Sequence, residues 1–404
     1  MAVFVLALGM LASGFYFAGK SGSTPDAYSN DFNVYYHAAR EILAGRDPYQ
    51  HSLGDWTPYI YPPLLAELMV PLAILPLPVA AYVWFLVSAG SVCFAAWFSA
   101  GLAYDKRGLE LTNQNNPGSN TWRAAIAACA VLLVFRFVLD TFALGQVNAV
   151  VAVLAVAHVL LYARDRKALS AIVLMLAVSI KLTPALLLLY HVAKLRLRFA
   201  VACAALIVAV TALSFLPFGV RAADVFHEFW SRTVRNEQGY DFAYSGNQSL
   251  RGAIERLKGA EPGRELHGED TSREPADPLT LLVSIGLLSA AAFAAVRARG
   301  ELAAAAPFFC GIVLLSPLSW KAHYVVLIPP AAYLLSLASR RGTARLLVVS
   351  LLAAAFLSFN LTSPRIIGLE AAEQADAYSF VFAGALLMFV GCVAWSRSQG
   401  SAEL

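Results

Sequence analysis

A single carboxylate, Asp31, stands in a polar segment directly after the first hydrophobic stretch of the chain. After it, Phe32, Tyr35 and Ala39 recur at helical spacing, which predicts a short amphipathic helix that suits the membrane surface and is closed by Gly45. Asp31 falls in the first turn of this helix, where free backbone N–H groups and the helix dipole favour a carboxylate. It is therefore either a helix cap or a catalytic base, and the local sequence fits both interpretations.

A second residue with chemical potential is Lys181, which lies deep in an apolar run. An uncompensated ammonium in the membrane interior costs about 3 kcal/mol or more, so Lys181 is expected to face a cavity or an anion. The alternative is that it snorkels or pairs with a buried acid. His323, at the end of another apolar run, can bind a phosphate or a sugar or transfer a proton, although an interfacial histidine is the simpler interpretation.

Polar clusters stand mostly at the junctions between loops and hydrophobic runs. They are the stretches 30–31, 59–63, 145–148, 245–252 and 316–324. Junctions attract polar and aromatic residues as interfacial anchors, so each cluster alone is weak evidence, but together they predict one pocket. The pocket would add candidate partners of a phosphate or of sugar hydroxyls, which are Lys321, Arg251, Gln146, Asn148, Asn247 and Gln248.

These residue types suit the transfer of a sugar from a lipid phosphate to a hydroxyl group. The phosphate is already a good leaving group, so the reaction needs one base for the acceptor, together with cations or hydrogen-bond donors for the phosphate. A second carboxylate acting as general acid, which most hydrolases require, is dispensable. No Asp-x-Asp element lies near Asp31, so the chemistry demands no metal, and we expect no cofactor.

Composition fixes the class of protein. The chain has 404 residues, of which 59% are hydrophobic and only 14% are charged. A soluble protein cannot bury so much apolar surface, whereas lipid solvates it directly. We expect an all-α polytopic membrane protein with roughly 11–13 hydrophobic helices, some of them short or re-entrant. Its expected partner is the lipid bilayer, and we expect no binding of nucleic acid.

The distribution of basic residues predicts the topology. The runs 168–181 and 183–193 have basic clusters at both outer ends, so they should form a helical hairpin that is broken at Lys181–Pro184. Residues 1–404 should form a single integral membrane domain, with a first outer loop at 20–61 and a large outer loop at 218–278. If the runs 62–76 and 79–103 both crossed the membrane, Lys106 and Arg107 would lie outside. One of the two runs therefore does not span if these basic residues are cytoplasmic, and the sequence leaves this open.

Other ionisable residues inside apolar runs have structural interpretations. Arg136 and Asp140 are four residues apart, a spacing that lets them pair on one helix face. Glu67, His158 and His191 are expected to be satisfied polar groups in the core.

The polar segments, taken in order, resemble a known family. DFNVYYHAAREILAGRDPY at 31–49, followed by YPP at 61–63, resembles the first outer loop of the polyprenol-phosphate-mannose-dependent mannosyltransferases of glycosyltransferase family 87. Further matches are GQVN at 145–148, KLTP at 181–184, GNQSLRG at 246–252 and LSPLSWKAHY at 315–324. The chain departs from many relatives because no basic segment precedes its first span. We expect this first span to be retained and not removed as a signal peptide.

The resemblance implies a GT-C glycosyltransferase fold and an inverting transfer from a donor such as polyprenyl-phosphomannose. It implies that Asp31 is the catalytic base and that Lys181 and His323 lie near the donor phosphate. We therefore expect a mannosyltransferase, or a close glycosyltransferase, of the plasma membrane. Its active site would face the outside or the periplasm, and its acceptor would be a glycolipid or a polysaccharide.

Two other classes of function remain as alternatives. Broken helices and an intramembrane lysine are also common in transporters and lipid flippases, although this sequence has no inverted repeat and crowds its polar clusters on one side. A non-catalytic assembly subunit is the third possibility, and the density of polar motifs gives it little support.

Overall fold

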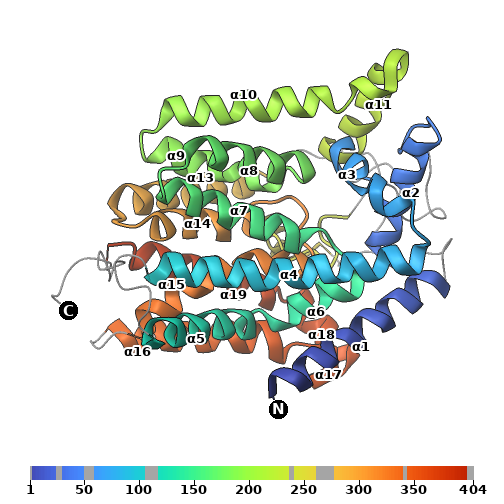
Figure 1. Ribbon diagram of the computed structural model, residues 1–404. Coiled ribbons are helices and arrows are strands. Elements are labelled where there is room, and N and C mark those ends of the chain that lie inside the picture. The colour runs from blue at the N-terminus through green and yellow to red at the C-terminus, as the bar shows by residue number, and fades with distance from the viewer. Residues whose placement is uncertain are drawn as a thin grey trace.

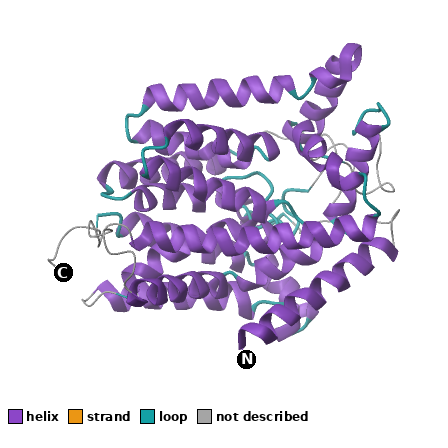
Figure 2. Cartoon of the chain, viewed as in Figure 1, coloured by secondary structure: helices purple, strands orange, loops and turns teal. Residues whose placement is uncertain are grey.

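Every regular element in the described part of the chain is helical (Figures 1 and 2). The computed structural model describes residues 2–23, 30–49, 59–104, 117–235, 241–260, 277–339 and 344–397. To residue 213, the α-helices are α1 (Ala2–Ser23), α2 (Asp31–Leu43), α3 (Pro63–Ala73), α4 (Leu77–Tyr104), α5 (Pro117–Leu133), α6 (Phe135–Leu144), α7 (Asn148–Ala163), α8 (Lys167–Ile180), α9 (Leu187–Ala193) and α10 (Leu197–Leu213). Beyond it they are α11 (Ala222–Phe229), α12 (Leu250–Leu257), α13 (Pro278–Arg297), α14 (Glu301–Leu314), α15 (Ile328–Ala338), α16 (Ala344–Phe356), α17 (Pro364–Ile367), α18 (Leu369–Ala377) and α19 (Phe380–Ala394). Five short 3-10 or π turns complete the set, η3 (Thr183–Leu186), η4 (Leu216–Arg221), η5 (Trp230–Val234), η6 (Lys321–Leu327) and η7 (Leu357–Leu361).

The helices have the lengths and apolar composition of a polytopic membrane protein. Within the described ranges, three are long and apolar enough to cross a bilayer, and three further pairs pass the same test but bend by 69°, 65° and 51° at a short break. Six shorter apolar helices accompany them. These segments agree with the expected number of hydrophobic helices and confirm that several are short or broken.

The long helices lie side by side, and α14 occupies the middle of the bundle (Figure 1). Every residue of α14 from Leu302 to Leu314 is buried. By contrast α13 is largely exposed, as expected for a helix whose outward face meets lipid. Helix α2 runs across the ends of the bundle rather than along it (Figure 1).

The apolar face of α2 is covered by protein rather than by lipid, which corrects one expectation. Its predicted extent is confirmed, since the helix ends at Leu43 and Gly45 follows with φ +68°. However, Phe32, Tyr35 and Tyr36 are all buried. Phe32 stacks on Trp84 of α4, and the Tyr36 hydroxyl donates to the Leu75 carbonyl at 2.8 Å. A helix held on this side by protein is a firmer support for a functional residue than one floating at a membrane surface.

Two hydrophobic clusters form the core, and they meet beside the loop at 145–148. One joins α4, α7, α8, α14, α15 and α19, and the other joins α1, α2, α3 and α4. Ala149 belongs to the first cluster, whereas Val147 and Val151 belong to the second. The loop at 145–148 is thus held where both parts of the bundle converge.

The runs 62–76 and 79–103 form helices of very different length. Helix α3 has only 11 residues, too few to cross the hydrocarbon, whereas α4 has 28. The stretch 105–116, which contains the basic pair of this region, lies outside the described residues.

The helical hairpin is broken as predicted. Helix α8 ends at Ile180, Lys181 adopts an extended conformation (φ −151°, ψ 127°), and the chain returns through η3 and α9. Fourteen residues of α8 rise only about 21 Å, so Lys181 is placed inside the bundle rather than beyond the bilayer.

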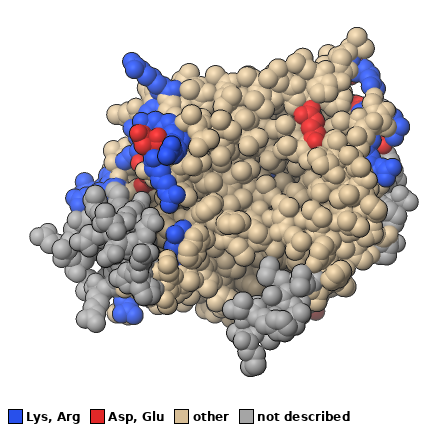
Figure 3. Space-filling view, viewed as in Figure 1, with Lys and Arg blue, Asp and Glu red and all other residues tan. Residues whose placement is uncertain are grey.

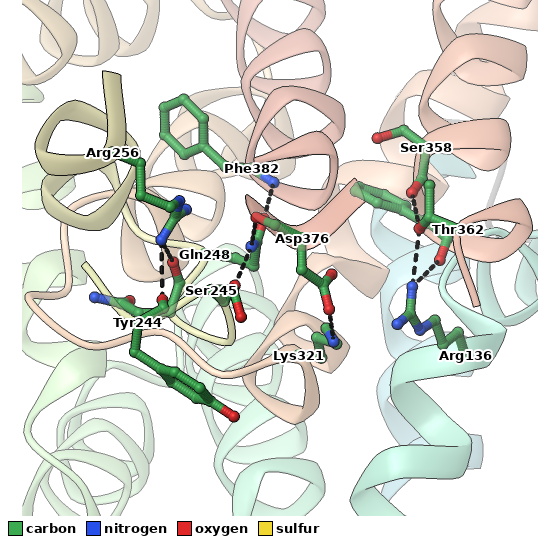
Figure 4. Close-up of polar contacts among 12 residues, drawn as sticks. Arg136, Tyr244, Ser245, Gln248, Arg256, Lys321, Ser358, Thr362, Asp376 and Phe382 are labelled. Carbon is green, nitrogen blue, oxygen red and sulfur yellow. Dashed lines mark hydrogen bonds and ion pairs between the residues drawn. The ribbon is translucent and has the colours of Figure 1, made fainter. Parts of the chain in front are cut away.

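The predicted Arg136–Asp140 pair is wrong. The Arg136 guanidinium donates to the Thr362 hydroxyl at 2.9 Å and to the Phe359 carbonyl at 3.4 Å, and within the described ranges it forms no ion pair with Asp140 (Figure 4). The side chain of Asn360 caps the same site by accepting from the Arg136 backbone N–H at 3.2 Å. Tertiary contacts with the segment 359–362 therefore outcompete the local i, i+4 spacing.

The expected satisfaction of buried polar groups holds only in part. His158 Nε2 lies 2.9 Å from His191 Nε2, and His158 Nδ1 lies 2.8 Å from the Ser170 hydroxyl. Among the described residues, however, His191 Nδ1 and Glu67 Oε1 are buried without a hydrogen-bond partner.

Candidate active site

The start of α2 separates the two interpretations of Asp31. Asn30 is the helix cap, because its side-chain oxygen accepts from the Asn33 N–H at 3.0 Å. Asn30 is itself fixed by donating from Nδ2 to the Ser21 hydroxyl of α1 at 2.8 Å. Asp31 is the first residue of the helix and is not needed as its cap, so its carboxylate is available for other interactions.

The loop between α6 and α7 is pinned at Gly145, which only glycine can occupy without strain. Its φ is +63°, and a Cβ there would lie 2.7 Å from ring and β carbons of Phe17 and Phe32. The Gly145 carbonyl accepts from Trp84 Nε1 at 2.7 Å. The backbone of the loop is thereby locked against α1, α2 and α4.

Two buried amides connect Asp31 to Lys181. Gln146 Nε2 donates to Asp31 Oδ2, and Gln146 Oε1 accepts from Asn148 Nδ2 at 2.5 Å. Asn148 Oδ1 in turn accepts from Lys181 Nζ at 2.7 Å. Because an ammonium only donates, the direction of every bond in this chain is fixed from the cation to the carboxylate. We call Gln146 and Asn148 the amide relay.

His323 completes the cationic end of this arrangement. Its Nε2 lies 3.0 Å from Lys181 Nζ, so with a protonated lysine Nε2 carries the lone pair and Nδ1 carries the proton. The Tyr61 ring centroid lies 5.6 Å from Lys181 Nζ, within the range of a cation–π contact. The Tyr61 hydroxyl lies 3.1 Å from that of Tyr35, so both tyrosines also border the site.

Exposure separates the groups that a substrate can reach from those that it cannot. Asp31, Lys181 and His323 are half-buried, whereas Gln146 and Asn148 are each 5% exposed. The site therefore presents one carboxylate and one pair of nitrogen groups, joined underneath by buried amides. The two amides were expected to bind sugar hydroxyls, but in the structure they hydrogen-bond to Asp31, to each other and to Lys181.

The cations Lys321 and Arg251 have protein partners outside the group around Lys181. Lys321 forms an ion pair with Asp376 of α18 (Figure 4). The Arg251 guanidinium lies over the Phe242 ring, 3.5 Å from its centroid. We therefore do not assign either to the group around Lys181.

Asn247 and Gln248 clamp loops together. Asn247 Oδ1 accepts from the Ser319 N–H at 2.9 Å, while its Nδ2 donates to the Pro317 carbonyl at 3.1 Å. Gln248 Nε2 donates to the carbonyls of Ser245 and Asp376 at 2.6 and 2.8 Å (Figure 4). Both residues are completely buried, so we assign them to loop architecture and not to sugar binding.

Sequence reasoning identified Asp31, Lys181 and His323 individually, whereas it included Asn30 and Tyr61 only as members of the polar clusters 30–31 and 59–63. Tyr61 stands in the Tyr-Pro-Pro stretch, whose two prolines restrict the backbone at the start of α3. That restriction was the available signal, because it holds the Tyr61 ring near Lys181.

Fold and site together define a polytopic membrane enzyme with one carboxylate set opposite a lysine and a histidine. Residues 59–318 match the model of glycosyltransferase family 87, and the chain belongs to this family. The prediction of a glycosyltransferase with a GT-C fold is thereby confirmed, in preference to a transporter or flippase.

Curated relatives extend over most of the chain. A polyprenol-phosphate-mannose-dependent alpha-(1-2)-phosphatidylinositol pentamannoside mannosyltransferase of Mycolicibacterium smegmatis is 31% identical over 91% of this chain and 85% of its own length. A polyprenol-phosphate-mannose-dependent alpha-(1-2)-phosphatidylinositol mannoside mannosyltransferase of the same organism is 28% identical over 92% of this chain and 86% of its own length. A Mycobacterium tuberculosis protein of the latter name is 28% identical over 82% of this chain and 75% of its own length.

Replacing Gly145 is expected to destabilise the whole protein. In Gly145→Ala, the left-handed backbone and the collision with Phe17 and Phe32 together should cost roughly 2 kcal/mol or more. The measurement is the thermal unfolding midpoint of purified protein. Gly90→Ala in α4 is the control, since its Cβ would meet nothing within 4 Å. Equal midpoints for the two variants would contradict the role of Gly145.

Proposed function

We propose that this protein transfers mannose from a polyprenyl-phosphate carrier to a hydroxyl group of a phosphatidylinositol-mannoside-like glycolipid on the outer face of the plasma membrane. The observation that carries the proposal is the connection of Asp31 to Lys181 and His323 in one half-buried site. The family supports sugar transfer, and the names of the relatives support the donor and the class of acceptor.

The proposed reaction is a single displacement at the anomeric carbon. Asp31 accepts the proton of the acceptor hydroxyl while the hydroxyl oxygen forms its bond to that carbon. The bond from the carbon to the phosphate oxygen breaks, and its electron pair leaves with the polyprenyl phosphate. Attack from the face opposite the phosphate inverts the configuration, which requires the base and the phosphate-binding groups to stand apart.

Lys181 and His323 would stabilise the departing phosphate. An ammonium forms charge-assisted hydrogen bonds with phosphate oxygens, and His323 can donate once its proton is on the nitrogen that faces the phosphate. At a site of low dielectric such donors act most strongly on the charge that develops in the transition state. Lys181 lies inside the bundle, which fits a phosphate whose polyprenyl chain remains in the lipid.

The amide relay would position both ends of the site. Gln146 and Asn148 are buried and cannot reach a substrate, yet each holds a group that can. The N–H of Gln146 keeps Asp31 in one rotamer and favours its ionised form, since a donor stabilises a carboxylate. The oxygen of Asn148 holds the ammonium of Lys181 until a phosphate replaces it.

The distribution of charge supports an outward-facing site. On the face in Figure 3, charged side chains gather towards the two ends, and the band between them is nearly free of charge. Lys194 and Arg196 lie at the same end as Glu301, where Arg196 pairs with Glu301 at 2.6 Å and Lys194 donates to the Ala298 carbonyl at 3.2 Å. Basic residues favour the cytoplasmic side, and Lys181 lies a helix length away from them.

Asp31→Asn is expected to lower kcat roughly a hundredfold to ten-thousandfold, because the amide cannot accept the proton. It can still accept the hydrogen bond from Gln146, so the fold should be retained. The measurement is mannose transfer from radiolabelled polyprenyl-phosphomannose to phosphatidylinositol mannosides by the purified protein. Glu41→Gln is the matched control, because it makes the same change of charge at the other end of the same helix, where Glu41 pairs with Arg46.

Two outcomes of this assay bear directly on the proposal. Normal turnover by folded Asp31→Asn protein would remove Asp31 as the base. Transfer from a nucleotide sugar in place of the polyprenyl donor would overturn the proposed donor.

Asn148→Asp is expected to raise the KM for the donor by roughly tenfold to a hundredfold. The new carboxylate would pair with Lys181 in competition with the phosphate, and it would have no N–H for Gln146. Gln374→Glu, an amide-to-carboxylate change at an exposed position of α18, is the control for the added charge. An unchanged donor KM would show that the relay does not act on Lys181.

The orientation can be checked with two single cysteines in a variant whose five native cysteines are replaced by alanine. Leu257→Cys and Leu195→Cys are matched, since these leucines are 82% and 84% exposed. A membrane-impermeant maleimide should label position 257 in intact cells and position 195 only after permeabilisation. The reverse pattern would place the site on the cytoplasmic face.

A further inference from the structure

A second group of charged residues lies beside the candidate active site. Its two anchoring residues are Asp140 of α6 and Lys321 of η6. The two elements are joined next to these residues, because the Thr141 hydroxyl donates to the Ala322 carbonyl at 3.1 Å. Ala322 directly precedes His323 in the chain. The group, which we call the outer charged cluster, consists of Asp140, Lys321, Asp376, Arg136 and Arg365.

Part of this cluster is already neutralised within the protein. Lys321 pairs with Asp376 through Oδ2, and Arg136 is held by the Thr362 hydroxyl (Figure 4). Each of these contacts uses only some of the polar atoms of its residues. The cluster therefore retains hydrogen-bonding capacity towards a ligand.

The remaining capacity that a ligand can reach is concentrated in one carboxyl group and one guanidinium. Within the described ranges, half-buried Asp140 forms no hydrogen bond or ion pair, although Arg136, Lys321 and Arg365 are near enough to interact with its charge. Asp376 is only 6% exposed, so its carboxylate stays inside the protein with Lys321. A half-buried carboxylate that receives no hydrogen bond is costly, so Asp140 favours a ligand that donates one.

The chemistry of these groups specifies the ligand. Carboxylate oxygens accept from hydroxyl groups, as a polyol offers, whereas the exposed guanidinium of Arg365 suits a phosphate. A ligand that carries hydroxyls beside a phosphate ester would engage both kinds of group at once.

Exposed apolar residues next to Arg365 place this arginine at a surface that suits contact with a lipid. Ile366 and Leu369 are 59% and 67% exposed, and they flank the cluster on α17 and at the start of α18. Apolar side chains at the border of a bilayer are suited to acyl chains, with the basic residue at the level of the headgroups.

We propose that the outer charged cluster binds the phosphorylated polyol headgroup of the glycolipid acceptor. Asp140 accepts from the polyol hydroxyls, and Arg365 binds the phosphate. This inference rests on the proposed function for the identity of the reaction. It assigns Lys321, as a member of this cluster, to the acceptor rather than to the donor phosphate.

Binding to the full-length purified protein tests the cluster without any turnover. The probes are dihexanoyl phosphatidylinositol, dihexanoyl phosphatidic acid and inorganic phosphate, and their binding is measured by titration calorimetry. The wild-type protein is expected to bind the phosphatidylinositol at least roughly tenfold more tightly than the phosphatidic acid. Only the phosphatidylinositol offers polyol hydroxyls to the carboxylate. Inorganic phosphate, which lacks both the polyol and the acyl chains, should bind most weakly.

Two variants separate the parts of the ligand. Asp140→Asn should abolish the preference for phosphatidylinositol, with Asp224→Asn at an exposed position of α11 as its control. Arg365→Gln should weaken binding of both phospholipids to a similar degree, with Arg345→Gln, an exposed position of α16, as its control. Arg365 is exposed, so its variant reports on binding even if a change at Asp140 disturbs the fold.

The proposal is overturned if the wild-type protein binds the two phospholipids equally, if inorganic phosphate binds as tightly as the lipids, or if Asp140→Asn keeps the preference. In transfer assays, Asp140→Asn should raise the KM for the acceptor and leave the donor KM unchanged. A purely structural role would lower the unfolding midpoint without this split. Loss of activity in Asp31→Asn together with an unchanged acceptor KM in Asp140→Asn would reject only the cluster, whereas an active Asp31→Asn would reject the proposed function itself.

Discussion

The ammonium of Lys181 is the constraint on which the site depends. A charge inside a bundle of apolar helices must be met by oriented partners, because the surroundings cannot solvate it. Here those partners are the oxygen of Asn148 and the ring nitrogen of His323. Meeting this requirement orders Asn148, which orders Gln146, which in turn fixes the carboxylate of Asp31. A single half-buried cation thus organises groups from four separate segments of the chain.

Broken helices make such a site possible in a membrane protein. A continuous helix would bury its backbone polar groups along its whole length, and it would present no loop within the bundle. The chain instead stops α8 at Ile180 and α6 at Leu144, and each end leaves a polar segment inside the protein. The surrounding core packs against these segments, so they are held in one conformation and not exposed to lipid.

The sequence predicted those parts of the fold that depend on neighbouring residues. The extent of α2, the break at Lys181 and the polar surroundings of its ammonium follow from apolar periodicity, from Pro184 and from the cost of a charge in an apolar run. The prediction failed where distant partners compete. Arg136 had a suitable acid one helical turn away, yet it binds the segment 359–362, because those oxygens meet the guanidinium directly.

The sequence by itself determined the membrane class, the positions of the helices, and Asp31 and Lys181 as candidate site residues. Each of these depends on the residue types in a short stretch of the chain. Only the tertiary structure decided which polar side chains meet one another. Gln146 and Asp31 are 115 positions apart and Lys181 and His323 are 142 apart, so no local pattern relates them. These hydrogen bonds form because two hydrophobic clusters pack together at the loop that carries the amides. In the same tertiary structure, the side chains of Asn247 and Gln248 are used to join loops.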